Sequence, residues 1–148
     1  MNLKKVLTAD LICTALQGES KQTIIEELLD LLVAKGQVRD RKTALKALLE
    51  REAKMSTGMQ HGLALPHAKT DAVDRLVGAI GIRREGIDFE SIDGEPSTIF
   101  ILTLSPLSRT GPHIQFLAEI GRLLEEEPLR DRIRNAKTAE DVLAVINS

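Results

Sequence analysis

Aromatic side chains make up only 2% of this chain of 148 residues, and both tryptophan and tyrosine are absent. The three phenylalanines leave few platforms on which nucleic-acid bases or sugar rings could stack. We therefore expect a core built from leucine, isoleucine, valine and alanine.

Cysteine occurs once, as Cys13. A single thiol excludes an internal disulfide and a cysteine-based zinc site, and it fits a reducing compartment. Because Cys13 follows Leu11 and Ile12, we interpret it as a small apolar residue rather than a nucleophile.

The chain has neither a large charge excess nor a long apolar run. Its formal net charge is −2, so electrostatics do not favour nucleic acid or an anionic membrane as a partner. No apolar run approaches the roughly 20 residues of a membrane span. The first residues, MNLKKVLTAD, lack the apolar segment of a signal peptide. We expect a cytoplasmic protein that does not insert directly into a membrane.

What is present is an ordinary globular balance, with 43% hydrophobic and 28% charged residues. A chain of 148 residues is long enough to bury a core without disulfides or metals. We see no linker, repeat or low-complexity segment, so one domain over residues 1–148 is predicted.

Apolar residues at helical spacing, together with capping residues, predict helices at both ends of the chain. The first expected helix begins at a cap at Ser20 and ends at Gly36, and the second runs from Asp40 toward Met55. The later helices follow Pro112 through Leu124, cover Leu129–Asn135, and run from a cap at Thr138 through Ile146. Glu125 to Pro128 is expected to break the helical pattern.

The middle of the chain is predicted to form strands. Leu76–Ile82 is apolar on both faces, as a buried strand is. Gly86 and Asp93-Gly94 indicate turns, and Ile99–Leu104, IFILTL, has the length and composition of a central strand. The predicted fold class is α/β: a single domain with a mixed β-sheet of about five strands flanked by helices.

Several common active-site motifs are missing. There is no GxxxxGK[ST] loop, no GxGxxG after a strand, no GxSxG elbow and no HExxH. The three histidines, His61, His67 and His113, have no local metal-binding spacing. The motifs therefore point to neither a nucleotide nor a metal cofactor.

The stretch GLALPHAKT places His67 directly after Pro66, at the end of an apolar run. Pro66 fixes its own φ and restricts Leu65 to an extended conformation, so the imidazole is aimed by a stiff backbone. Ala68 is small and leaves room for a partner. Two interpretations remain open from these residues alone: a packed structural histidine, or a nucleophile oriented through one ring nitrogen and exposed at the other.

Two further residues could assist such a nucleophile. His113 follows Gly111-Pro112 in the expected first turn of a helix, where backbone N–H groups favour an anion; its alternative role is to cap the helix. Arg51, within Glu50-Arg51-Glu52, is either part of a solvated charged face or a guanidinium fork for phosphoryl oxygens. His61 lies in a glycine-flanked loop and is expected to be exposed.

Taken together, these residues resemble a known family. The stretch REAKMSTGMQHGLALPHAKTDAV, beginning at Arg51, resembles the active-site signature of the enzyme IIA domains of the phosphoenolpyruvate-dependent sugar phosphotransferase system. The fructose/mannitol class, which includes nitrogen-regulatory IIA proteins, is the most similar. The similarity continues through GIDFESIDGEP, IFILTL, GPHIQFLAEIGRLL and LRDRIRNAKTAEDVLAVI, and so covers nearly the whole chain.

The resemblance implies a phosphotransferase that carries a phosphohistidine and needs no metal or nucleotide. It implies that His67 accepts a phosphoryl group through Nε2 from the carrier protein HPr and passes it to a cysteine of a IIB domain. It also implies that His113, as the second histidine, and Arg51 stabilise the phosphoryl group. Transfer of this kind requires in-line positioning and charge stabilisation rather than acid–base chemistry.

Other roles remain open within this resemblance. A nitrogen-type regulatory protein would use its phosphorylation state to control a target protein instead of sugar uptake. A degenerate domain that only binds partners is a third possibility, but the intact set of Arg51, His67 and His113 argues against it. The chain departs from the family pattern at Gln60, where a glycine is usual, so Gln60 and His61 are expected to affect the loop and the choice of partner.

Overall fold

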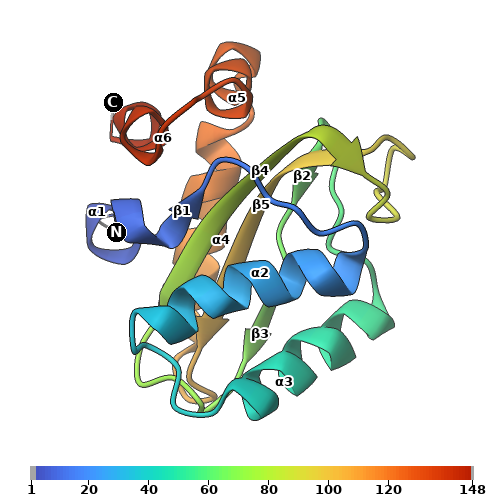
Figure 1. Cartoon of the computed structure of the whole chain (residues 1–148). Coiled ribbons are helices and arrows are strands. Elements are labelled where there is room, and N and C mark those ends of the chain that lie inside the picture. Colours follow the sequence, from blue (N-terminus) through green and yellow to red (C-terminus); the bar gives the residue numbers. More distant parts are fainter. Residues whose placement is uncertain (1–2, 148) are drawn as a thin grey trace.

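A mixed sheet of five strands forms the middle layer of the computed structural model, which describes residues 3–147 (Figure 1). The strands follow the order β1-β4-β5-β2, and β3 also pairs with β5. They are β1 (Ile12–Cys13), β2 (Leu63–Ala64), β3 (His67–Lys69), β4 (Val77–Ile87) and β5 (Ser97–Ser105). Among the strand pairs within residues 3–147, only β4–β5 is antiparallel. The predicted α/β class with a mixed sheet is confirmed.

Helices cover both faces of this sheet. α2 and α3 pack on one face, whereas α4, α5, α6 and the short α1 lie on the other side (Figure 1). The helices are α1 (Leu3–Val6), the 3-10 helix η1 (Ala9–Leu11), α2 (Lys21–Ala34), α3 (Arg41–Lys54), α4 (Thr110–Leu123), α5 (Glu127–Arg134) and α6 (Ala139–Ile146). The sheet thus separates two apolar cores.

Strand β5 contributes to both cores, as the apolar run IFILTL predicts. Ile99 and Ile101 point toward the α4 side, and Phe100, Leu102 and Leu104 point toward α2 and α3. Successive side chains of a strand point to opposite faces, so a central strand must be apolar throughout. β5 lies between β4 on one edge and β2 with β3 on the other.

The two helices on the α2–α3 side begin and end where the sequence indicates. The Ser20 hydroxyl accepts a hydrogen bond from the Thr23 N–H, and the Asp40 carboxylate does the same for Thr43. Gly36 adopts a left-handed φ of 77° just after the last turn of α2. These helix ends therefore lie where the local capping residues predict them.

Three predicted boundaries are wrong, one because a strand pairs past a glycine and two because a helix begins before a proline. Gly86 does not end the strand: β4 continues to Ile87, and Gly86 takes a φ of 76° where the register with β5 shifts. The helix expected to follow Pro112 already begins at Thr110, and the expected break at Glu125 to Pro128 ends early because α5 begins at Glu127, so both prolines lie in the first turn of a helix. Proline is tolerated there because the N–H it lacks has no acceptor inside the helix.

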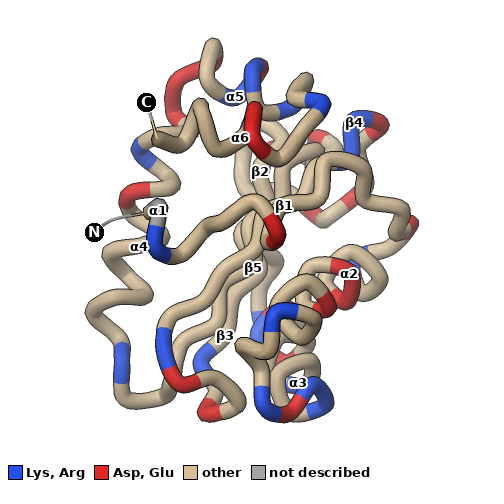
Figure 2. The backbone as a smooth tube through the Cα atoms, turned by 60° about the vertical axis from the view of Figure 1, so that its left-hand side comes forward, with Lys and Arg blue, Asp and Glu red and all other residues tan. Residues whose placement is uncertain are grey.

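Charges of both signs occur on the molecule (Figure 2). The charged residues of α2 are mostly acidic and those of α3 are mostly basic, and the formal net charge of the chain is −2. Within residues 3–147, none of the helices has both the length and the apolar character needed to cross a membrane.

Candidate active site

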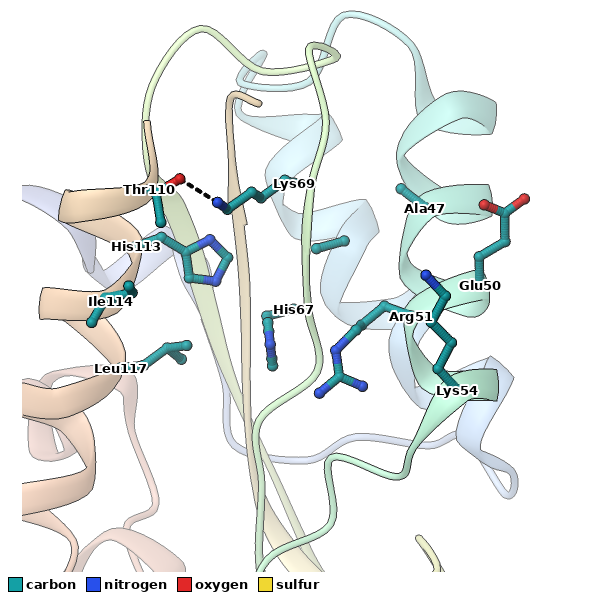
Figure 3. Close-up of a pocket in the computed structure, with 11 residues that line it drawn as sticks. Ala47, Glu50, Arg51, Lys54, His67, Lys69, Thr110, His113, Ile114 and Leu117 are labelled. Atoms are coloured by element: carbon teal, nitrogen blue, oxygen red, sulfur yellow. Dashed lines mark hydrogen bonds between the residues drawn. The ribbon is translucent and has the colours of Figure 1, made fainter. Parts of the chain in front are cut away.

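The three residues singled out from the sequence line one cleft of about 480 Å³. Arg51 comes from α3, His67 from β3 and His113 from α4, so the cleft lies between two helices that cover opposite faces of the sheet (Figure 3). The side chains of Arg51 and His113 extend from their helices toward His67 (Figure 3). Residues that are 62 positions apart in sequence, Arg51 and His113, therefore face the same imidazole.

The backbone around Pro66 determines where His67 lies. Strand β2 ends at Ala64 and β3 begins at His67, and both run parallel to β5. Pro66 lies between them, and its carbonyl accepts a hydrogen bond from the Thr103 N–H at 3.0 Å. His67 is consequently the first residue of a strand, not the last residue of the apolar run before it.

One hydrogen bond sets the chemistry of His67. Its Nδ1 lies 2.8 Å from the carbonyl oxygen of Leu65. Because a carbonyl can only accept, Nδ1 carries the ring proton and Nε2 has a free lone pair. Burial lowers the pKa of His67 below its usual value; the Leu65 hydrogen bond opposes this, and the charge of Arg51 lowers the pKa further. His67 is thus a neutral imidazole with a nucleophilic Nε2 near pH 7.

His113 lies deeper than His67. Its side chain is 4% exposed, and its ring centroid is 5.3 Å from that of His67, with an interplanar angle of 78°. Burial, and then the neighbouring His67 and Lys69, lowers the pKa of His113 to about 4. Its Nδ1 is 2.7 Å from the Ser105 hydroxyl, whereas its Nε2 is buried and has no hydrogen-bond partner among residues 3–147.

Arg51 is held at the end of α3. Its guanidinium donates one hydrogen bond to the Met55 carbonyl at 2.8 Å, within the last turn and cap of the helix. The remaining N–H groups of a planar guanidinium are available for an anion. The position of Arg51 in the cleft favours the guanidinium fork over a purely solvated charged face.

Glu52, next to Arg51, was not singled out from the sequence. It is buried and accepts hydrogen bonds from the Thr57 N–H at 2.8 Å, the Thr57 hydroxyl at 2.6 Å and the Lys21 ammonium at 2.9 Å. Burial raises the pKa of Glu52, but the hydrogen bonds from Thr57 and Lys21 outweigh burial and lower it. Its negative charge favours the protonated form of His67, which partly offsets Arg51.

Lys69 is a further cation of the cleft that sequence reasoning missed. It is two residues after His67 in β3 and therefore lies on the same face of the strand. Its ammonium donates a hydrogen bond to the Thr110 hydroxyl at the start of α4 (Figure 3). The alternation HAK within an expected strand was the signal that could have identified it.

The loop that precedes β2 departs from expectation in one detail. His61 is exposed, as predicted, and lies outside the cleft that holds His67. The left-handed conformation falls on His61, with a φ of 64°, and on Gly62, rather than on Gln60. Gln60 is therefore accommodated without the backbone geometry that requires a glycine.

The cleft can bind an anion and present a nucleophile to it. Arg51, Lys69 and His113 line the same cleft as His67. Among residues 3–147, no group of three or more His, Cys, Asp or Glu side chains is arranged to hold a metal ion. These features define the site as one in which a histidine can accept an anionic group.

Comparison with known proteins agrees with this class. The family model described as "Phosphoenolpyruvate-dependent sugar phosphotransferase system, EIIA 2" matches residues 5–148. The chain belongs to this family of EIIA proteins.

Its relatives include sugar-specific and regulatory proteins. The chain is 38% identical to the fructose-specific EIIA component of Haloferax volcanii, over 98% of this chain and 96% of that protein. It is 30% identical to the fructose-specific EIIABC component of Bacillus subtilis over 99% of this chain, but it spans only 23% of that longer protein. A nitrogen regulatory protein of Pseudomonas aeruginosa is 28% identical over 99% and 95% of the two chains.

Solved structures show the same fold. The nitrogen regulatory protein IIA-Ntr of Neisseria meningitidis superposes with a TM-score of 0.85, at 26% identity and with 97% of this chain and 98% of that chain covered. Mannitol enzyme IIA of Escherichia coli gives a TM-score of 0.81 at 22% identity, with 95% and 98% covered.

Proposed function

We propose that this chain is a phosphoryl carrier in which Nε2 of His67 accepts a phosphoryl group from a phosphorylated HPr-like protein. The observation that carries the proposal is the 2.8 Å hydrogen bond from His67 Nδ1 to the Leu65 carbonyl. It leaves Nε2 unprotonated and oriented, which is what in-line attack on phosphorus requires.

The phosphoryl transfer does not require a proton to leave the site. The lone pair on Nε2 of His67 forms a bond to phosphorus, and the bond between phosphorus and the donor's imidazole nitrogen breaks. The donor nitrogen keeps that electron pair. The phosphorylated ring of His67 is then cationic, and its Nδ1–H remains hydrogen-bonded to the Leu65 carbonyl, which disperses the positive charge.

The surrounding groups stabilise the charge on the transferred group. The guanidinium of Arg51 supplies N–H donors for the equatorial oxygens, His113 Nε2 contacts the same oxygens, and the Lys69 ammonium adds positive charge. In this assignment Arg51, His67 and His113 form the catalytic set of a phosphotransferase, and the functional domain extends over residues 1–148. We place the reaction in the cytoplasm, where HPr-like carriers act.

The second partner is a IIB domain with an acceptor cysteine. Two observations support it. Mannitol enzyme IIA of Escherichia coli, a fold neighbour at 22% identity and a TM-score of 0.83, was solved in complex with phosphorylated enzyme IIB. Exposed apolar side chains also lie near the cleft: Ile114 on its rim is 62% exposed and Met55, next to the end of α3, is 70% exposed. Such side chains suit a protein partner that covers the site.

The 38% identical Haloferax relative favours fructose as the sugar.

A regulatory role is the second candidate. Nitrogen regulatory proteins match the chain over nearly its full length at 28% identity. In that role the phosphorylated and unphosphorylated forms would differ in their affinity for a target protein, and no IIB cysteine would be needed.

Phosphorylation in a reconstituted system tests the proposal. The protein is incubated with phosphoenolpyruvate, enzyme I and HPr, and acid-labile phosphate is measured. We expect about one phosphate per chain, located on His67. Absence of phosphate from folded protein contradicts the carrier role.

Subsequent addition of a fructose-type IIB domain separates the two roles. Loss of phosphate from His67 with its appearance on the IIB cysteine supports transport. Retention of the phosphate, with a phosphorylation-dependent complex to another protein, supports regulation.

A further inference from the structure

Ser105 is the last residue of β5, and its side chain is fully buried beneath His113. Its backbone is fixed, because the Ser105 carbonyl accepts a hydrogen bond from the Thr70 N–H at 2.8 Å. Its hydroxyl oxygen is 2.7 Å from His113 Nδ1. Within residues 3–147 this ring nitrogen is the only hydrogen-bond partner recorded for the hydroxyl.

The direction of this hydrogen bond follows from counting protons. If the hydroxyl donates to Nδ1, the proton of a neutral His113 is on Nε2, and that N–H is the one group of the pair without a partner. If Nδ1–H donates instead, the buried hydroxyl proton and the lone pair of Nε2 both lack partners. Buried polar groups are rarely left unpaired, so the first arrangement is favoured.

We infer that Ser105 is a positioning residue that fixes His113 in the tautomer with its proton on Nε2, directed into the cleft. The inference rests on the proposed function, because an N–H at this position matters only if an anion binds beside His67. A neutral imidazole in the opposite tautomer would present a lone pair to phosphoryl oxygens and repel them. Ser105 thereby makes the second histidine a hydrogen-bond donor without requiring it to be charged.

The assignment explains why His113 Nε2 is buried and unpaired. In a protein interior such a group needs a partner, and the phosphoryl group on His67 would supply oxygen acceptors close to it. No proton moves during transfer: Nε2–H of His113 donates a hydrogen bond to an equatorial oxygen, while Nδ1 continues to accept from Ser105.

NMR of the unphosphorylated protein tests the tautomer directly. Long-range proton–nitrogen correlations at pH 7 distinguish a protonated ring nitrogen from one with a free lone pair. We expect His113 to be protonated at Nε2 and to accept at Nδ1, with His67 showing the reverse pattern. A protonated Nδ1 on His113 overturns the inference, whatever the transfer rates are.

Substitution tests whether the tautomer matters for transfer. Ser105→Ala is expected to slow phosphorylation of His67 about tenfold, since it removes one hydrogen bond from the charge-stabilising set. In a His113→Ala background the same change is expected to have almost no further effect. Ser97→Ala is the matched control: Ser97 is also fully buried on β5, and its hydroxyl pairs with Ser91 outside the cleft at 3.0 Å.

The outcomes are distinct. Equal rates for Ser105→Ala and the wild-type protein, or an equal slowing by Ser97→Ala, overturn the positioning role. If the wild-type protein has the expected tautomer but acquires no phosphate on His67, the proposed function fails and the tautomer assignment stands.

Discussion

The β3 side and the α4 side of the cleft each contribute one histidine, and the two imidazoles are held in opposite ways. His67 is half-buried and its Nδ1 faces a backbone carbonyl, which can only accept a hydrogen bond. His113 is 4% exposed and its Nδ1 faces a hydroxyl, which can donate. A histidine side chain is thus a nucleophile on β3 and a hydrogen-bond donor on α4. The hydrogen-bond partner of its Nδ1 decides which role it has.

Electrostatics separate the two sides as well. Burial lowers the pKa of both histidines, but His67 also has Glu52 nearby, whose negative charge favours protonation. The two neighbours that affect the pKa of His113, His67 and Lys69, both lower it. Both rings are neutral near pH 7, yet His113 resists protonation to a lower pH.

The largest expected difference is between replacing His67 and replacing His113. His67→Ala removes the acceptor atom, so we expect no acid-labile phosphate at all. His113→Ala removes one donor and is expected to slow labelling by about tenfold or more while leaving the phosphate on His67. The measurement is the time course of phosphate per chain, with folding checked by circular dichroism. Wild-type rates for His113→Ala would show that its assigned role is wrong.

The buried, neutral state of His113 predicts a pH-dependent stability. The unfolded chain binds a proton to this residue near its ordinary pKa of 6.5, and the folded protein does so only at about 4. The contribution of His113 to the free energy of unfolding is therefore complete above pH 6.5. It falls by about 3 kcal/mol as the pH drops from 6.5 to about 4.

Urea unfolding at a series of pH values measures this loss. His113→Gln, which has no proton to gain in this range, is expected to lose about 3 kcal/mol less than the wild-type protein between pH 6.5 and 4, while the contribution of His67, whose pKa is also lowered, remains. An equally steep decline in the variant would assign the pH dependence to other groups.

Arg51→Ala is expected to slow phosphorylation of His67 about a hundredfold, because it removes charge-assisted donors from the phosphoryl oxygens. Arg132→Ala, an exposed arginine of α5, is the matched control and should transfer at nearly the wild-type rate. Rapid-quench labelling compares the two. Similar rates for both arginine variants would remove Arg51 from the site.

The smallest predicted effects have opposite signs at neighbouring positions. Arg51→Ala removes a charge that lowers the pKa of His67, so that pKa should rise; Glu52→Gln removes a charge that raises it, so it should fall. NMR titration of the His67 ring protons measures both shifts. Shifts in the same direction would contradict the electrostatic assignment.

Much of the fold and of the candidate site could be predicted from the sequence. The caps at Ser20 and Asp40 and the central strand Ile99–Leu104 depend on local patterns, and the structure has them where they were expected. Arg51, His67 and His113 were singled out from neighbouring residues and a family resemblance. The structure brings all three to one cleft.

The missed features depend on tertiary contacts. Ser105 resembles any loop-forming serine until β5 and α4 bring it beneath His113. Glu52 looks like part of a charged run, and only the packing of α2 against α3 brings the Lys21 ammonium to it. Gly86 has the composition of a turn, but pairing with β5 carries the strand past it.

The most direct test of the central claim is where phosphorus attaches to His67. Protein labelled with nitrogen-15 is phosphorylated by phosphoenolpyruvate, enzyme I and HPr, and the phosphorus–nitrogen coupling is measured by NMR. The hydrogen bond from Nδ1 to Leu65 predicts coupling to Nε2 of His67, with Nδ1 still protonated. Coupling to Nδ1, or to a nitrogen of another histidine, would contradict this account.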